Sequence, residues 1–358
     1  MKIDHVHFYA RNAARTKDWF IRHVGFKAIA NYLSQHTHTE LIALNSAYFL
    51  ISSPLSDRSP VASYLANHPE GIADIAFRVE DLGLILDRSR LLGQTILEDV
   101  RLTESPQGNF SSARITGWQD LQHTLIETKD NLDCCLPISI QQNRIETPKS
   151  YNIADTNITD IDHVVLNVGQ GELDSAVTLY QDLFDFRVQQ NFQIQTSKSG
   201  LTSQALIDDV GEVQFNINQP TTANSQIQEF INLNHGSGIQ HLALRSQNLI
   251  ADVVRMSHNN VQFLNVPKAY YKKLRSLSAL STAERKAVAE QQILVDWERY
   301  TPQSLLMQIF TQPILEQPTF FLEFIERRQS AQGFGQGNFQ ALFEAVERQT
   351  QQASHTTV

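Results

Sequence analysis

The chain has few features that would send it out of a reducing compartment or into a membrane. Its 358 residues include only two cysteines, and these are adjacent, at Cys134 and Cys135. They provide no disulfide framework, and they are fewer thiolates than a structural zinc site normally uses. No apolar run approaches the roughly 18–20 residues needed to span a bilayer. Met1-Lys2-Ile3-Asp4 leads directly into a predicted strand, so we expect no signal peptide and a cytoplasmic protein.

An excess of positive charge is also missing. The formal net charge is −9, which argues against a nucleic-acid partner and against an anionic membrane surface. Hydrophobic residues make up 41% of the chain, enough to bury a sizeable core. The length suggests two or more modules.

The sequence repeats itself at low similarity. An aromatic residue precedes a phenylalanine by the same spacing in both halves, Phe20 to Phe26 and Tyr180 to Phe186. The other matched segments are Ile3–Phe8 with Ile161–Leu166, Gly71–Phe77 with Gly238–Leu244, and Leu125–Glu127 with Phe321–Glu323. Two divergent copies of one unit are therefore predicted.

Each copy has the pattern of a strand, a helix and several strands, after which a similar unit follows. This predicts an α+β protein of two tandem modules built from βαβββ repeats, with residues 1–150 forming the first module and a linker, and residues 151–358 the second. A hairpin is expected at Asn45-Ser46. The second copy carries an inserted helix over 279–291, with Ser281 or Thr282 as N-cap, and a last helix over about 338–351.

Three apolar, strand-like segments of the second copy each contain one potential metal ligand. These ligands are His163, His241 and Glu323. Two histidines and one carboxylate form the ligand set of mononuclear non-heme Fe(II) enzymes, which leave coordination positions open for substrate and O2. Side chains alternate between the faces of a strand, so the three converge if those faces line one cavity.

Residue types alone leave another interpretation open. A single histidine in an apolar strand is more often a hydrogen-bonded core residue than a ligand. A lone glutamate in such a strand is less ordinary, because burial of an unpaired carboxylate is costly. The repeat favours the metal interpretation, since all three candidates fall at recognisable places in a duplicated unit.

The first copy has a different trio at the positions that the sequence repeat aligns with these ligands. They are His5, Asp74 and Glu127, and a histidine with two carboxylates can hold a divalent ion. The alternative is a solvated or helix-capping Asp74 and a hydrogen-bonded His5.

Several motifs together resemble one enzyme family. The motifs are Asp162-His163, Gly238-Ile239-Gln240-His241, residues 305–311, Pro318-Thr319-Phe320-Phe321-Leu322-Glu323 and Gly333-Phe334-Gly335-Gln336-Gly337-Asn338-Phe339. They resemble the 4-hydroxyphenylpyruvate dioxygenase family of the vicinal oxygen chelate superfamily, over nearly the whole chain. The resemblance implies that each module is an open mixed β-barrel with flanking helices, and that a C-terminal helix acts as a lid.

The resemblance also implies a reaction. Fe(II), held by His163, His241 and Glu323, would convert 4-hydroxyphenylpyruvate and O2 to homogentisate and CO2 in tyrosine catabolism, by oxidative decarboxylation, ring hydroxylation and side-chain migration. It implies an N-terminal module that binds no iron, and a homodimer or homotetramer. The implied catalytic residues are Gln240, Gln308 and Asn338; the implied substrate-binding residues are Ser203, Asn218, Gln226, Phe310, Phe321, Phe334 and Phe339.

One segment departs from the family. Where the family has Pro-x-Asn-Glu-Pro, this chain has Asn216-Ile217-Asn218-Gln219-Pro220, and Asn216 shares a strand face with Asn218. An extra amide is thus expected in the pocket.

Three other functions remain open. Hydroxymandelate synthase acts on the same substrate but hydroxylates the benzylic carbon; Phe339 and Asn218 favour ring attack. Extradiol ring cleavage of a catechol is a second alternative. A non-catalytic binding module is the third, and retention of all three ligand candidates argues against it.

Overall fold

The structure is a computed structural model. It describes residues 1–105, 108–135, 156–196, 199–298, 301–329, 331–335 and 337–338. The N-terminal module comprises β1 (Lys2–Tyr9), α1 (Ala13–Trp19), the π-helical turn η1 (Phe20–Val24), β2 (Lys27–Leu33), β3 (Thr37–Leu44), β4 (Ala47–Pro54), α2 (Pro60–Asn67), β5 (Gly71–Arg78), α3 (Leu82–Leu91), β6 (Ile96–Ser105), β7 (Gly108–Thr116) and β8 (Gln122–Glu127).

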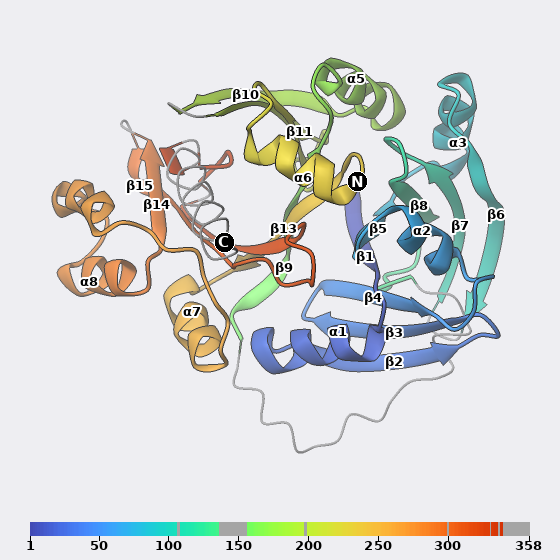
Figure 1. Ribbon diagram of the computed structural model, residues 1–358, viewed down its shortest axis with the longest axis horizontal. Coiled ribbons are helices and arrows are strands. Elements are labelled where there is room, and N and C mark those ends of the chain that lie inside the picture. Colours follow the sequence, from blue (N-terminus) through green and yellow to red (C-terminus); the bar gives the residue numbers. More distant parts are fainter. Residues whose placement is uncertain are drawn as a thin grey trace, which may run out of the picture.

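The C-terminal module repeats this order with one insertion. It comprises β9 (Ile158–Asn167), α5 (Leu173–Phe184), β10 (Arg187–Gln195), β11 (Gly200–Ile207), β12 (Gln214–Pro220), α6 (Gln226–Asn234), β13 (Gly238–Ser246), α7 (Leu249–His258), the 3-10 helix η2 (Lys268–Ser276), α8 (Thr282–Glu290), β14 (Leu294–Glu298), β15 (Thr301–Phe310) and β16 (Phe321–Arg328). The inserted η2 and α8 lie at the outer end of this module (Figure 1).

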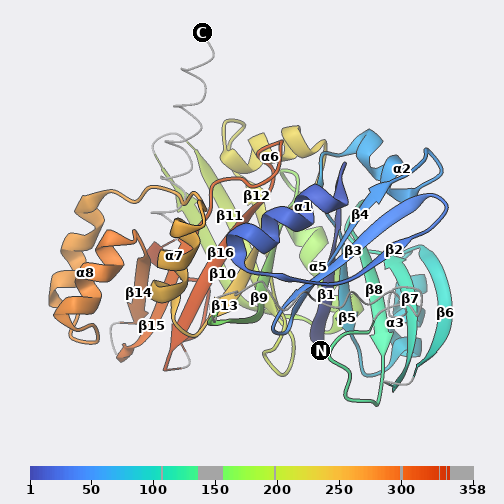
Figure 2. The same ribbon diagram turned by 90° about the horizontal axis from the view of Figure 1, so that it is seen from below.

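The two modules have the same sheet topology. The strand orders are β2-β3-β4-β1-β5-β8-β7-β6 and β10-β11-β12-β9-β13-β16-β15-β14, each a mixed sheet of eight strands. In both, the first strand pairs in parallel with the fourth and antiparallel with the fifth. The prediction of tandem vicinal-oxygen-chelate modules, each an open mixed β-barrel, is confirmed, and the modules lie side by side (Figure 2).

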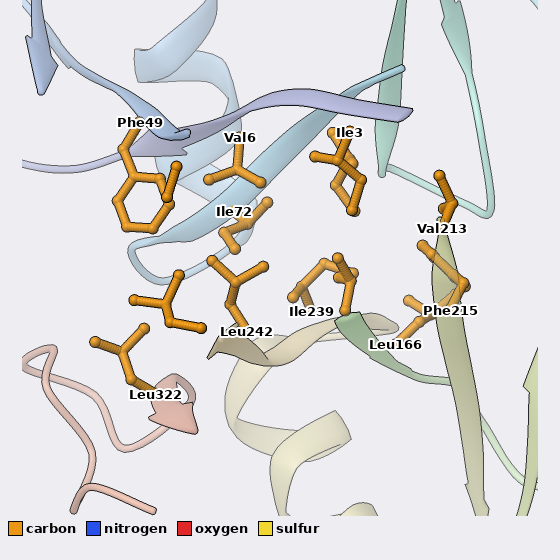
Figure 3. Close-up of a cluster of buried hydrophobic side chains, with 14 of the residues drawn as sticks. Ile3, Val6, Phe49, Ile72, Leu166, Val213, Phe215, Ile239, Leu242 and Leu322 are labelled. Atoms are coloured by element: carbon orange, nitrogen blue, oxygen red, sulfur yellow. The ribbon is translucent and has the colours of Figure 1, made fainter. Parts of the chain in front are cut away.

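The largest hydrophobic core lies between the modules. Val6, Phe49 and Ile72 of the first module face Leu242 and Leu322 of the second across it (Figure 3). Because side chains alternate along a strand, β9, β13 and β16 bury one face in this shared core and turn the other into their own barrel. The module interface therefore decides which residues can line a site.

Local predictions can be compared with these elements. The hairpin at Asn45-Ser46 is confirmed by the pairing of β3 with β4 around Asn45, whose φ is 52°. The inserted helix is α8, where Ser281 is the N-cap and forms a capping box with Glu284. The last helix lies almost entirely outside the described residues, as does the boundary at 150, which stays a prediction. Among the described residues, no helix is long and apolar enough to cross a membrane.

Candidate metal centre

The register of three central strands brings the predicted ligands to one place. Ala243 of β13 lies opposite His163 on one side and Glu323 on the other. His241 lies two residues along β13 on the same face. His163, His241 and Glu323 thus project from neighbouring strands into the barrel, on the side away from the intermodule core.

The three side chains converge. His163 Nε2 lies 3.2 Å from Glu323 Oε2, and His241 Nε2 lies 3.5 Å from the same oxygen. One ligand atom from each lies within 4.8 Å of the other two, and all three residues are buried. Two imidazole nitrogens and a carboxylate oxygen at this spacing are suited to a divalent transition metal with open positions.

The electrostatics of this cluster also fit a cation. Burial alone would raise the pKa of Glu323, but the charge of His163 and hydrogen bonds from His163 and His241 lower that pKa to about 2. Burial would lower the pKa of His163, yet Glu323 and Asp162 raise it to about 9. Without a metal, a protonated imidazole therefore neutralises a buried carboxylate, and a divalent ion would supply that positive charge instead.

Asp162 orients His163, a role that the sequence analysis did not assign. His163 Nδ1 lies 2.9 Å from Asp162 Oδ1. Because a carboxylate only accepts hydrogen bonds, the Nδ1 proton points to Asp162 and Nε2 is left to face Glu323. Arg327 and Arg245 in turn donate to Asp162. A carboxylate directly before a ligand histidine, in an apolar strand that must bury it, was the available signal.

A chain of amide contacts holds the other oxygen of Glu323. Gln308 Nε2 donates to Glu323 Oε1 at 2.8 Å and to the Phe334 carbonyl at 3.0 Å. Asn338 Nδ2 donates to Gln308 Oε1 at 2.9 Å, and the Tyr270 hydroxyl donates to Asn338 Oδ1 at 2.7 Å. The sequence analysis missed Tyr270, whose contact depends on the inserted segment.

Aromatic rings enclose the cluster. Phe321 stacks on His241 with ring centroids 4.7 Å apart, and Phe310 approaches the same imidazole at 6.2 Å. Phe334 meets His163 edge-on at 5.0 Å. A small pocket is lined by His241, Gln308, Phe310, Glu323, Phe334, Gly335 and Asn338. Phe334 and Gly335 also line a wider cleft beyond them, so they form the wall between the two.

The remaining predicted residues are spread more widely. Ser203 and Asn218 are opposite each other on β11 and β12 and are buried. Gln240 lies at a bulge of β13 beside His241 and is half-buried. Gln226 is half-buried at the start of α6, and no contact draws it toward the ligands. Phe339 lies outside the described residues.

The trio proposed for the first module is wrong. In the sheet, Asp74 pairs with Gln122 as His241 pairs with Phe321, so the counterpart of Glu323 is Thr124 and not Glu127. Thr124 donates its backbone N–H and its hydroxyl to Asp74.

The true counterpart of Glu127 is Glu326. Each accepts the first backbone N–H of a helix, Glu127 from Leu82 of α3 and Glu326 from Leu249 of α7. Glu127 therefore caps a helix and does not converge with His5. The sequence repeat misled by three residues, because both segments end in an apolar pair followed by glutamate.

Comparison with known proteins agrees with this arrangement. Residues 160–277 match the model of the Glyoxalase/Bleomycin resistance protein/Dioxygenase superfamily. An uncharacterised protein of Synechocystis is 34% identical over 97% of both chains. The 4-hydroxyphenylpyruvate dioxygenase of Dictyostelium discoideum is 31% identical, again over 97% of both chains. The chain belongs to the 4-hydroxyphenylpyruvate dioxygenase family.

Membership of the 4-hydroxyphenylpyruvate dioxygenase family makes the chain an oxidoreductase. A solved structure with the same fold is a triple mutant of 4-hydroxymandelate synthase from Streptomyces coelicolor. It aligns with a TM-score of 0.85 and 25% identity over 98% of both chains. The family and this neighbour carry names for two different reactions, so the choice between them depends on the site.

Proposed function

We propose that this chain is an Fe(II)-dependent dioxygenase that converts 4-hydroxyphenylpyruvate and O2 to homogentisate and CO2. The observation that carries the proposal is the convergence of His163, His241 and Glu323 in a buried, aromatic-walled site of a family member. The atoms balance, because one carbon and two oxygens leave as CO2 and the remaining carbons keep both other oxygens.

Bound Fe(II) would supply the redox chemistry and two adjacent positions for an α-keto acid, with one for O2. The chain's own residues supply geometry. Asp162 fixes the tautomer of His163, and Gln308 holds Glu323 Oε1 so that Oε2 faces both imidazoles. Each of these positions is defined before a substrate arrives, which lowers the cost of reaching the reactive geometry.

The aromatic side chains provide the substrate's surroundings. Phe310 and Phe321 are buried beside His241, where they would contact the substrate ring. Phe334 covers His163. Exclusion of water by these rings strengthens every electrostatic interaction at the ligands and limits side reactions.

Benzylic hydroxylation to 4-hydroxymandelate is the second candidate, supported by the structural likeness to 4-hydroxymandelate synthase. The two products are isomers, so O2 uptake and CO2 release do not separate them. The test is anaerobic reconstitution with Fe(II), addition of 4-hydroxyphenylpyruvate and O2, and chromatographic identification of the product. Homogentisate supports our proposal, and 4-hydroxymandelate would reject it in favour of the second candidate. Absence of both, with no O2 consumed, would reject both activities.

Two accompanying assignments are part of the proposal. The protein is cytoplasmic, in keeping with only two, adjacent cysteines, and it assembles as a homodimer or homotetramer. Light scattering on the purified protein measures its mass directly, and a monomer would contradict the second assignment.

A further inference from the structure

The barrel interior contains a buried amide that no group of the protein satisfies. Asn216 of β12 is 0% exposed, and neither its Oδ1 nor its Nδ2 has a hydrogen-bond partner within the described part of the chain. Most buried side-chain amides are paired, because the loss of water is otherwise uncompensated. An unpaired amide facing a pocket therefore points to a ligand that pairs it.

Alternation along β12 places this amide inside the barrel. Phe215 and Ile217, on either side, belong to the core between the modules, where Phe215 can be followed in Figure 3. Asn216 consequently faces the other way, as do the ligands on β9 and β13.

Cross-strand register then fixes its distance from the metal ligands. Asn216 pairs with Val165, and Val165 pairs with His241. Two strand spacings separate Asn216 from His241, or about 10 Å between Cα atoms. On its other side Asn216 pairs with Ala205, which packs against Phe334 of the pocket wall. The amide is therefore within reach of a molecule bound at the ligands.

The neighbouring row adds further unpaired atoms. Ser203, Asn218 and Asn167 lie opposite one another on β11, β12 and β9. Asn218 donates to Asn167, which leaves Asn218 Oδ1, Asn167 Nδ2 and Ser203 Oγ without partners among the described residues. With both polar atoms of Asn216, five buried polar atoms await a partner.

One phenolic hydroxyl cannot satisfy this set, because it donates one hydrogen bond and accepts at most two. Asn216 also lies one side-chain step closer to the metal ligands than Ser203 and Asn218 do, about 7 Å along the strands. A group that pairs with Asn216 would thus sit between the far end of the substrate and the metal. An amide that both donates and accepts matches a hydroxyl there.

Building on the proposed function, we infer that Asn216 forms a subsite for a second ring hydroxyl. Aromatic α-keto acids with two adjacent ring hydroxyls, of which 3,4-dihydroxyphenylpyruvate is the simplest, are then bound in preference to 4-hydroxyphenylpyruvate. The terminal hydroxyl pairs with the row of Ser203, and the hydroxyl next to it pairs with Asn216.

The test compares equilibrium binding of both keto acids to the iron-loaded enzyme, measured by calorimetry without O2. The variant is Asn216→Val, which suits a strand and removes the amide. The matched control is Gln204→Val, a polar residue on the outward face of the adjacent β11. Thermal unfolding and iron content verify that both variants fold and keep the metal.

We expect the wild-type enzyme and Gln204→Val to prefer the dihydroxy acid, and Asn216→Val to lose about tenfold of that preference, the order expected for one buried hydrogen bond. An unchanged preference in Asn216→Val would overturn the inference, and would mean that water pairs the amide or that the catechol approaches iron in another orientation. Binding of neither keto acid by the wild-type enzyme would instead reject the proposed function, and the inference with it.

Discussion

Arg327 donates two hydrogen bonds to Asp162, one from Nε at 2.8 Å and one from Nη2 at 2.7 Å. The two residues are 165 positions apart in the sequence. Burial would raise the pKa of Asp162, but Arg327 holds that pKa well below its usual range. Since Asp162 orients His163, this pair sets the direction of a metal ligand without touching the metal.

Replacement of Arg327 should weaken metal binding. In Arg327→Met the carboxylate of Asp162 loses its main partner, and His163 loses its fixed orientation. We expect Fe(II) affinity to fall about 10–100-fold, as with other residues that orient metal ligands. The measurement is a metal titration of the purified variant.

Arg245→Met provides the matched control, because Arg245 also donates to Asp162 but its side chain is 39% exposed. Solvent screens this contact, so the expected loss of affinity is under about threefold. Equal losses in the two variants would contradict the role given to the Arg327 pair.

Glu323→Ala should abolish both iron binding and turnover, because it removes the anionic ligand of the site. Iron content is measured after reconstitution, and product is measured with 4-hydroxyphenylpyruvate. The control is Glu326→Ala, which deletes the helix-capping carboxylate three residues away. That variant should lose about 1 kcal/mol of stability and keep its iron. Iron retained at the wild-type level in Glu323→Ala would exclude Glu323 as a ligand.

Gly335→Ala should impair catalysis through Gln308. A Cβ at Gly335 would lie 1.9 Å from Gln308 Oε1, and the residue's φ is +75°. Gln308 must then move, which disturbs its contacts with Glu323 and Asn338. We expect kcat/KM to fall on the order of 100-fold, the cost of displacing a positioning group by about 1 Å.

Gly93→Ala separates this clash from backbone strain. Gly93 has the same φ of +75°, and nothing lies within 4 Å of an added Cβ. It should cost about 1–2 kcal/mol of stability for the left-handed conformation and leave activity unchanged. A similar fall in kcat/KM in both variants would rule out the contact with Gln308 as the cause.

Stability should depend on pH through His123, which joins the modules. Its Nε2 lies 3.0 Å from the Tyr180 hydroxyl, and burial lowers its pKa from 6.5 to about 4 despite the opposing charge of Asp74. The unfolded chain therefore takes up a proton below pH 6.5 that the folded chain does not accept until about pH 4. This contribution is complete above pH 6.5 and is lost progressively as the pH falls to 4.

The loss should amount to at most about 3 kcal/mol, since one pKa unit corresponds to about 1.4 kcal/mol. Denaturant unfolding of the wild type and His123→Gln, at pH values from 7 to 4, measures it. The glutamine variant should show the smaller decline. Parallel curves for the two proteins would show that His123 is not the group responsible.

Much of the site followed from local patterns. Strand alternation placed His163, His241 and Glu323 on faces that could meet, and the duplicated segments marked the strands that bring them together. These patterns act within a few residues, so they can be recognised without knowing the fold. The proposal of an aromatic keto acid as substrate rested on motifs at the same positions.

Other features came only from register and long-range packing. The sequence repeat aligned Glu127 with Glu323, whereas the pairing of β5 with β8 aligns Thr124 with it. Local similarity could not distinguish these alignments, because both segments have an apolar pair before a glutamate. Only hydrogen-bonded register between strands separates a metal ligand from a helix cap.

What the sequence by itself determined was the set of residue types and the face on which each projects. The tertiary structure decided which of those faces became a site. Burial of Val164, Leu166 and Leu242 between the modules turned the opposite face into a closed barrel. Apolar area removed from water drives that choice, and it left the polar and ligating side chains, Asn216 among them, with only each other and a ligand as partners.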